Sequence, residues 1–322
     1  MKLKSIVIPA ALAAFLLGGC AAQPQGSTSG EGERLTVLAT TYPTYLMASA
    51  MAEGVEGVTV SRLNTGAVSC LHDYTLTVND MKQIEQADVI VVNGAGLEDF
   101  MADALGSARG LVVDCSQGLE LLENEDHDHV EGDEADHDHG HWDPHYWMDP
   151  DLALQMAENI QNALVEADGE YAWNYQSNYT ETATLMAGWK DKLRDYCHYE
   201  EGPEISGLIT FHDGFRYFAR ALDLPLLAAI EEEEGSEASA MEINRITQLV
   251  EENGLPVIFT EVNGSDATAQ AISRETGCAV AQLTMLMDGP EYTGLQDYYD
   301  GLYGNVQAIV NGFAGEEVMQ RS

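Results

Sequence analysis

The chain has 322 residues, with 54 acidic and 14 basic side chains and a formal net charge of −40 at pH 7. This charge argues against nucleic acid and anionic membrane surfaces as partners and suits cations, although solubility or adaptation to salt would also explain it. A hydrophobic content of 45% is enough for a packed core, and the chain length indicates two domains rather than one.

The N-terminal segment has the features of an export signal. Two lysines precede an apolar run, residues 6–17, which is too short to cross a bilayer comfortably. The run leads into Leu-Gly-Gly-Cys at 17–20, which resembles the lipobox of bacterial lipoproteins and implies cleavage before Cys20 and lipid attachment to its thiol. An ordinary secretory signal followed by a stray cysteine is the alternative. We expect a signal peptide at 1–19, a flexible tether at 20–33, and a protein held outside the cytoplasm on the cell membrane by lipid.

The rest of the chain alternates strand and helix patterns in two halves. The run VIVV at 89–92 is apolar on both faces, as expected for a strand in a sheet that helices cover. Strands that alternate with helices predict a parallel α/β sheet in each half. In the first half, the patterns predict strands at 35–42, 58–63, 88–93 and 110–114 and helices at 44–53, 79–87 and 97–105. In the second half, they predict strands at 205–211, 226–230, 257–261 and 279–286 and helices at 214–222, 238–253, 266–275 and 295–313.

Between the halves the pattern is helical and contains no strand. A helix at 151–167 ends at Asp168-Gly169, and a second helix over 170–198 would be about 43 Å long at ~1.5 Å per residue. The predicted fold is therefore α/β, with two lobes, each a parallel β-sheet flanked by helices, joined by a long rigid helix that keeps lobe closure small. The expected boundaries are an N-terminal lobe at 34–168, a linking helix at 169–198 and a C-terminal lobe at 199–322.

Six of the nine histidines lie in residues 124–150, NEDHDHVEGDEADHDHGHWDPHYWMDP. The part from 124 to 141 has almost no apolar residues and is expected to be a mobile loop, whereas 142–150 is aromatic, bracketed by prolines and expected to be ordered around His145. A solvated acidic loop is the alternative to metal capture. The loop histidines form an accessory metal tract: His127, His129, His137, His139 and His141.

Four candidate metal ligands lie in loops, three of them after predicted strands and His145 in the loop that leads out of the first lobe. The loops at the carboxyl ends of parallel strands form the ligand crevice of such a sheet. The four candidates are His72, His145, His212 and Asp288, two from each half. Taken singly, each histidine could be a hydrogen-bonded structural residue, and Asp288 could cap the turn before Gly289. The flanking carboxylates could orient an imidazole or cap local turns: Asp73, Asp143, Asp149, Asp213 and Glu261.

Five motifs in this order and spacing resemble the metal-binding lipoproteins of bacterial zinc and manganese ABC importers, the cluster A-I solute-binding proteins. The motifs are GAVSCLHDY, WDPHYWMDP, ITFHDGFRYFA, IFTEVNGSDATAQAISRETG and LMDGPEYTG, and the likeness extends from about residue 35 to 318. The resemblance implies one metal between two lobes, held by His72, His145 and His212 with Asp288 as fourth ligand, and a membrane permease as partner. The first motif departs from the usual GxDPHDYEP, because Ser69-Cys70-Leu71 precede His72. The loop that carries His72 therefore differs from the family pattern.

Three imidazoles and one carboxylate suit tetrahedral Zn²⁺, whereas Mn²⁺ prefers more oxygen ligands. Manganese members of the family usually have a Glu where His212 stands. We therefore predict a monomeric zinc-binding protein, without catalytic activity, that delivers Zn²⁺ to an ABC importer. The alternatives are a manganese or iron binder of the same type, a zinc hydrolase, which would need a general base that no HExxH motif supplies, and an adhesin that zinc structures.

Four cysteines follow Cys20, which permits two disulfides in an exported chain with three possible pairings, or free buried thiols. Cys70 and Cys115 both lie near strand ends of the first half, so we favour their pairing. Cys197 and Cys278 would then form the second disulfide.

Overall fold

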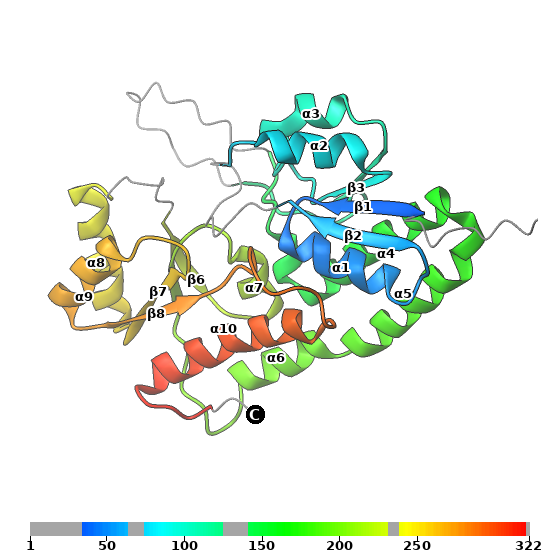
Figure 1. Ribbon diagram of the computed structural model, residues 1–322. Helices are drawn as coiled ribbons and strands as arrows, with labels where there is room; N and C mark the ends of the chain where they lie inside the picture. Colours follow the sequence, from blue (N-terminus) through cyan, green and yellow to red (C-terminus); the bar gives the residue numbers. More distant parts are fainter. Residues whose placement is uncertain (1–33, 64–73, 125–140, 231–237, 320–322) are drawn as a thin grey trace, which may run out of the picture. The chain divides into compact units, whose positions relative to one another are not determined.

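The computed structural model describes residues 34–63, 74–124, 141–230 and 238–319. Two four-stranded parallel sheets form its framework (Figure 1). The strands of the first sheet are β1 (Leu35–Ala39), β2 (Val58–Arg62), β3 (Val89–Val92) and β4 (Leu111–Asp114). Those of the second are β5 (Leu208–Phe211), β6 (Leu226–Ala229), β7 (Val257–Glu261) and β8 (Ala279–Leu283). The predicted fold class is confirmed.

The two sheets have the same strand order. The first reads β2-β1-β3-β4 and the second β6-β5-β7-β8. Val37 pairs with Val89 across β1 and β3, and Thr210 pairs with Phe259 across β5 and β7. The order reverses between these central strands, and ligands of open α/β sheets bind outside the carboxyl ends at such a point. The fold therefore places the residues after β5 and β7 at a crevice.

The helices begin where the sequence supplies caps. Thr41 caps α1 (Tyr42–Ala52) and Thr77 caps α2 (Val78–Gln86), each accepting a hydrogen bond from the backbone N–H three residues on. Gly254 has φ +58° and ends α8 in the left-handed conformation that glycine tolerates best. The remaining helices outside the linker are α3 (Ala102–Gly106), α7 (Arg216–Ala221), α8 (Ala240–Asn253), α9 (Ala267–Thr276) and α10 (Gln296–Ala314).

The connection between the halves is helical, as predicted, but it is interrupted. After α4 (Pro150–Ala167), helix α5 covers Ala172–Met186 and helix α6 covers Trp189–Cys197. The expectation of one continuous helix over 170–198 is wrong at one point, because Gly188 has φ +79° and cannot continue a right-handed helix. The periodicity of the sequence did not show this break.

Alternate residues of the central strands enter different cores. Val89 and Val91 of β3 belong to one large core, whereas Ile90 and Val92 face a smaller core with residues of α2 and α3. In β7, Val257 also joins the large core and Ile258 faces α8 and α9. The large core thus contains residues of both sheets, of α1, α4 and α10, and it is continuous across the two halves. Such a shared core resists relative motion of the halves, because close-packed interiors transmit strain.

Trp147 lies at the centre of this shared core. It belongs to the 3-10 turn η3 (Tyr146–Met148) and has no exposed surface. Its indole N–H donates to the carbonyl of Met285 at 2.8 Å. The hydroxyl of Tyr298 donates to the backbone carbonyl of Trp147 at 2.6 Å. The aromatic segment before α4 is therefore fixed to the second half both by packing and by hydrogen bonds.

A buried carboxylate organises the carboxyl edge of the first sheet. Glu98 accepts hydrogen bonds from the Thr40 hydroxyl at 2.6 Å and from the N–H groups of Asn93 and Gly94 at 2.8 and 2.9 Å. Asn93 in turn donates to the carbonyl of Pro144 at 3.0 Å. The carboxylate thereby holds the loop after β3 against the segment that precedes His145.

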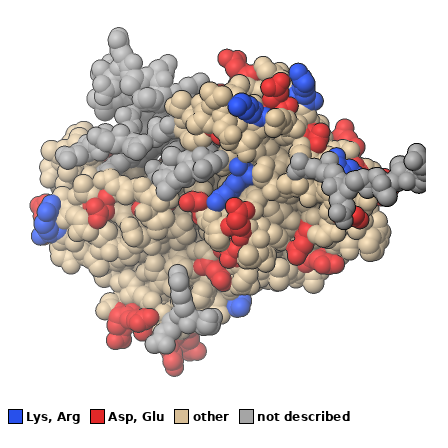
Figure 2. All heavy atoms as spheres, in the orientation of Figure 1, with Lys and Arg blue, Asp and Glu red and all other residues tan. Residues whose placement is uncertain are grey.

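Acidic side chains are spread over the face shown in Figure 2, with few basic ones among them. This spread fits a general role in solubility at least as well as a local role in attracting cations. Among the helices in the described ranges, none is both long and apolar enough to cross a membrane. The domain boundaries drawn from the sequence remain predictions.

Replacing Trp147 by alanine should lower the free energy of unfolding by about 3–5 kcal/mol, because it opens a cavity in the shared core and leaves the Met285 carbonyl without its donor. The matched control is Trp173→Ala, since Trp173 is 75% exposed, and it should change stability by no more than about 0.5 kcal/mol. Urea unfolding of both variants measures the difference. Equal effects of the two substitutions would contradict the central position of Trp147.

Burial raises the pKa of Glu98 from 4.5 to about 7. The folded protein then binds this proton more tightly than the unfolded chain. The resulting stability is complete below pH 4.5 and is lost as the pH rises through about 7. At about 1.4 kcal/mol per pKa unit, the loss is about 3 kcal/mol at most.

In the metal-free protein, Glu98→Gln should therefore make the free energy of unfolding depend less on pH between 4.5 and 8. This holds even if the substitution also changes the stability by a constant amount. Urea unfolding at several pH values measures the slope. Glu85→Gln, on the exposed surface of α2, is the control and should keep the wild-type slope. If the free energy of unfolding varies with pH in the same way in wild type and in Glu98→Gln, Glu98 has the same pKa in the folded and the unfolded protein, and the prediction is wrong.

Candidate metal centre

His145 is fixed by the residues around it. It follows Pro144, directly precedes the turn η3, and is 8% exposed. Its backbone N–H and its Nδ1 both lie 2.9 Å from Oδ1 of Asp143. In the neutral imidazole, a hydrogen bond from Nδ1 to this carboxylate leaves the lone pair on Nε2. The ring is thus oriented as a metal ligand that binds through Nε2.

Asp143 is itself held from the second half of the chain. Nη1 of Arg216 lies 3.7 Å from its Oδ2, and the hydroxyl of Tyr217 donates to its backbone carbonyl at 2.9 Å. The Tyr217 hydroxyl also accepts the N–H of Leu122 at 2.7 Å. The sequence left imidazole orientation and turn capping both open for Asp143, and the carboxylate makes both contacts. Asp149 instead caps α4 and pairs with Lys190 at 3.0 Å.

His212 lies beside His145 although 67 residues separate them. The two ring centroids are 5.6 Å apart and the rings are nearly perpendicular. Gly214 makes this approach possible, since a Cβ there would lie 3.1 Å from Cδ2 of His212 and 3.2 Å from Cδ2 of His145. The same Cβ would overlap the sulfur of Met285, so any larger residue at 214 would disturb the pair.

Asp288 points to an arginine. Its Oδ1 lies 3.3 Å from Nη2 of Arg62, and half of its side chain is exposed. The chain reaches this position through Leu286, whose φ of +60° lies in the left-handed region that bulky residues rarely adopt. The local sequence pattern did not predict that Arg62 would pair with Asp288.

Glu261 ends β7, next to the strand that leads to His212. Burial raises its pKa from 4.5 to about 7, while one carboxylate oxygen accepts the Asn263 N–H at 2.6 Å. The side chain is 1% exposed, and the structure gives it this turn-capping contact rather than a bond to an imidazole. The sequence left both roles open.

The described ranges bring together two of the four predicted ligands, His145 and His212. Within those ranges no group of three or more His, Cys, Asp or Glu side chains is placed to hold a metal ion. The reasons are that His72 lies outside the described residues and that Asp288 faces Arg62. Also outside the described residues are Cys20, Cys70, His127, His129, His137 and His139.

The ends of the histidine-rich loop meet at its base. The N–H of Asn124 donates to the carbonyl of His141 at 3.1 Å, and Glu123 and Trp142 form an antiparallel bridge. The His141 ring stacks edge-on against Trp142 at 4.4 Å, and its Nε2 lies 3.9 Å from Glu123. The base of the loop is therefore a short paired ribbon beside the segment that carries His145.

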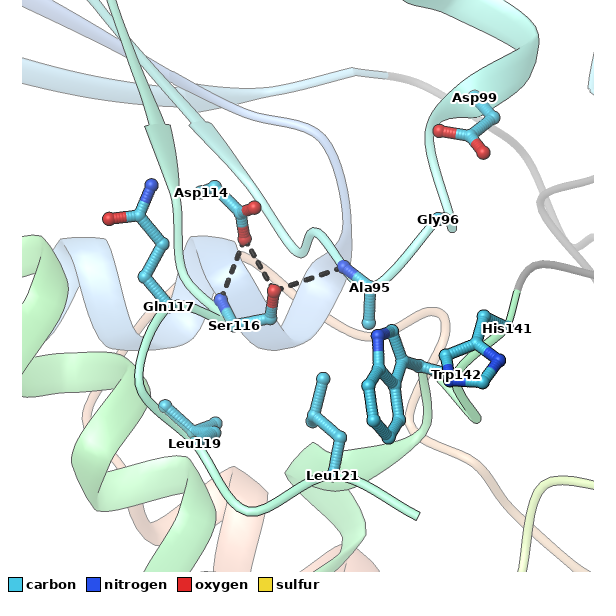
Figure 3. A pocket seen from close by; sticks show the side chains of 10 residues that line it. All are labelled: Ala95, Gly96, Asp99, Asp114, Ser116, Gln117, Leu119, Leu121, His141 and Trp142. Carbon is cyan, nitrogen blue, oxygen red and sulfur yellow. Dashed lines mark hydrogen bonds between the residues drawn. The ribbon is translucent and has the colours of Figure 1, made fainter. Parts of the chain in front are cut away.

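A cavity of about 510 Å³ lies next to this ribbon, at the carboxyl ends of β3 and β4 (Figure 3). His141 and Trp142 line it together with Asp114 and Ser116. Oδ1 of Asp114 accepts the Ser116 hydroxyl at 2.6 Å, which in turn accepts the Ala95 N–H at 3.1 Å. Neither His145 nor His212 lines the cavity, so it is separate from the imidazole pair.

Three described cysteines are free and buried: Cys115, Cys197 and Cys278. The predicted pairing of Cys197 with Cys278 is wrong, because Cys197 belongs to the large shared core and Cys278 to the core under α8 and α9. Cys115 forms no disulfide with the other described cysteines, and its pairing with Cys70, which lies outside the described ranges, stays a prediction.

Comparison with known proteins gives related sequences over most of the chain. The zinc-binding protein AdcA of Streptococcus pyogenes is 27% identical over 311 residues, covering 89% of this chain, which spans only 58% of the length of AdcA. The high-affinity zinc uptake system protein ZnuA of Bacillus subtilis is 28% identical, with 84% of this chain and 85% of that protein covered. The manganese-binding lipoprotein MntA of Halalkalibacterium halodurans is 24% identical, with 94% and 95% covered.

A solved structure also matches the fold. The crystal structure of ZnuA superposes with a TM-score of 0.72 at 26% identity, covering 86% of this chain and 98% of that one. The family model described as ZnuA, zinc-uptake complex component A, periplasmic, matches residues 37–312. Since this match spans well over half of the chain, the protein belongs to the ZnuA family of periplasmic zinc-uptake components.

Proposed function

We propose that this protein binds Zn²⁺ outside the cytoplasm and delivers it to the membrane permease of an ABC importer. The observation that carries the proposal is the imidazole pair: His145, oriented by Asp143, and His212 lie 5.6 Å apart at the ends of different halves of the chain. His72 and Asp288 are proposed to complete the site. Its chemistry is binding and release of a cation, with no reaction on the metal.

Zinc is favoured over manganese by the donor set. The two neighbouring imidazoles, with His72 as a proposed third, suit Zn²⁺, whereas Mn²⁺ favours sites dominated by oxygen. The zinc names of AdcA and ZnuA support the same choice, and MntA keeps the manganese alternative in view. Competition between the two ions on one sample decides between them.

The alternatives explain the structure less well. A hydrolase needs a general base near the open metal position, and the carboxylate next to His145 is already engaged with Nδ1. A zinc-structured adhesin would need the metal for folding. Here, by contrast, one apolar core from side chains of both halves is complete without any metal ligand. The shared core therefore fits a protein that stays folded as cargo enters and leaves.

The location proposed from the sequence completes this function. After cleavage of the signal peptide at 1–19, lipid on Cys20 would hold the two lobes near the permease, with 20–33 as tether. The lobes are proposed as 34–168 and 199–322, with the helical linker at 169–198 between them. We propose that the protein acts as a monomer, because the core that joins its halves lies within one chain.

His145→Ala should lower the affinity for Zn²⁺ by ~10-fold or more. Loss of a residue that only orients a metal ligand already has an effect of this size, and here the proposed ligand itself is removed. Competition titration with a zinc chelator measures the affinity. His198→Ala is the matched control, since His198 is exposed and contacts the Leu222 carbonyl at 2.8 Å, away from the imidazole pair. An unchanged affinity in His145→Ala would refute the site.

The histidine-rich tract should act as a weaker collector of Zn²⁺ beside the main site, because ordering a polar tract costs ~1–2 kcal/mol per residue fixed. Residues 125–140 can be replaced by Asn-Gly, since Asn124 and His141 already face each other as in a hairpin. Calorimetric titration should show one tight equivalent retained and the weaker equivalents lost. Uptake should then fail only when zinc is scarce.

The control for this replacement keeps the loop length and changes only the histidines of 125–140 to serine. It should lose the weaker equivalents in the same way. If the tight equivalent disappears from both proteins while they remain folded, the tract supplies a primary ligand, and the separation between collector and main site is wrong.

A further inference from the structure

Arg62 occupies a fixed position beside the predicted fourth ligand. It is the last residue of β2, and the chain continues from it to the motif that contains His72. Its guanidinium donates to the carbonyl of Gly289 at 2.6 Å and lies over the rings of Tyr42 and Tyr45, 4.8 and 5.5 Å from their centroids. The side chain is 24% exposed, so packing and hydrogen bonding both restrain it.

The segment after β8 is anchored to α1 by contacts that do not involve Asp288. The hydroxyl of Tyr45 donates to Glu291 at 2.9 Å and accepts the Tyr292 N–H at 3.1 Å, and the hydroxyl of Tyr292 donates to Glu53 at 3.0 Å. Gly289 packs directly on Tyr42, since a Cβ there would overlap the tyrosine ring. The partners of Arg62 therefore stay in place whichever way the Asp288 carboxylate turns.

Asp288, by contrast, is held loosely. Its Oδ1 accepts the N–H of the next residue, Gly289, at 2.8 Å and pairs with Arg62 at 3.3 Å, and half of its side chain is exposed. A long, partly exposed ion pair of this kind is weak and exchanges readily. A rotation of one side chain is enough to release the carboxylate.

The same segment borders the imidazole pair. Met285 packs against Gly214, between His145 and His212, and Asp288 follows Met285 after the left-handed turn at Leu286. In the proposed site, the Asp288 carboxylate would turn from the guanidinium of Arg62, its partner in the structure, to a metal ion held by the histidines. A carboxylate oxygen that pairs with one of these cations is less available to the other.

Resting on the proposed function, we propose that Arg62 competes with the bound metal for Asp288 and thereby limits the affinity of the site. In the metal-free protein the guanidinium holds the carboxylate. When a divalent cation binds, Asp288 turns to it and gives up its ion pair with Arg62. This residue favours release, because the carboxylate has a partner to return to when the metal leaves.

Arg62→Gln removes the charge and keeps a donor for the Gly289 carbonyl. It should bind Zn²⁺ roughly tenfold more tightly than wild type in a chelator competition and release it more slowly in stopped flow, because the Asp288 carboxylate no longer has a competing partner. Arg62→Met, which keeps the apolar stem over Tyr42 and Tyr45, should behave in the same way. Arg109→Gln is the control, since Arg109 is exposed and contacts only Glu85, at 3.5 Å, among the described ion pairs.

A double-mutant cycle tests whether the effect passes through Asp288. Asp288→Asn should weaken binding, and Arg62→Gln added to it should give much less tightening than in wild type, because the competition no longer exists. Full tightening in the Asp288→Asn background would overturn the proposal in favour of a general charge effect. Folded Arg62→Gln and Arg62→Met with wild-type affinity would overturn it as well.

The outcome is distinguishable from a failure of the proposed function. If wild type binds no Zn²⁺, the function itself fails. If wild type binds Zn²⁺ and the Arg62 variants bind it with the same affinity, the site stands and the competition is refuted. Thermal melting of each variant confirms that the compared proteins are folded.

Discussion

The apolar core that both halves share is the constraint on which the rest of the structure depends. Trp147 is buried in it and bonded to the second half through the Met285 carbonyl and the Tyr298 hydroxyl. Because this contact fixes the aromatic turn that follows His145, the position of this proposed ligand from the first half is set by packing against the second. A site built in this way can be rigid even though its members come from both ends of the chain.

A polar layer above that core gives the imidazoles their orientation. Asp143 fixes the tautomer of His145, and Arg216 and Tyr217, which follow His212 on the next helix, hold Asp143 in turn. The residues that orient one ligand thus lie next to another ligand in sequence. The two imidazoles are therefore positioned together, and displacement of either α7 or the turn η3 would disturb both.

The proposed competition makes charge act locally at this site, through one ion pair. Acidic residues are spread over the surface that Figure 2 shows. The contact on which the proposal depends is the ion pair between Arg62 and Asp288. Coulomb interactions fall with distance and are screened by salt, so one fixed guanidinium near the ligands outweighs many remote carboxylates. Affinity in such a site depends on which cation the carboxylate faces.

The sequence by itself determined the fold class, nearly every strand and helix, and the position of His145 and His212 after strands or next to ordered turns. These features follow from local periodicity and from the rule that parallel strands present their carboxyl ends at one edge. Tertiary structure alone decided the separate cores of Cys197 and Cys278 and the pairing of Arg62 with Asp288. Those depend on which distant side chains meet when the halves pack, and no local pattern in the sequence records such a meeting.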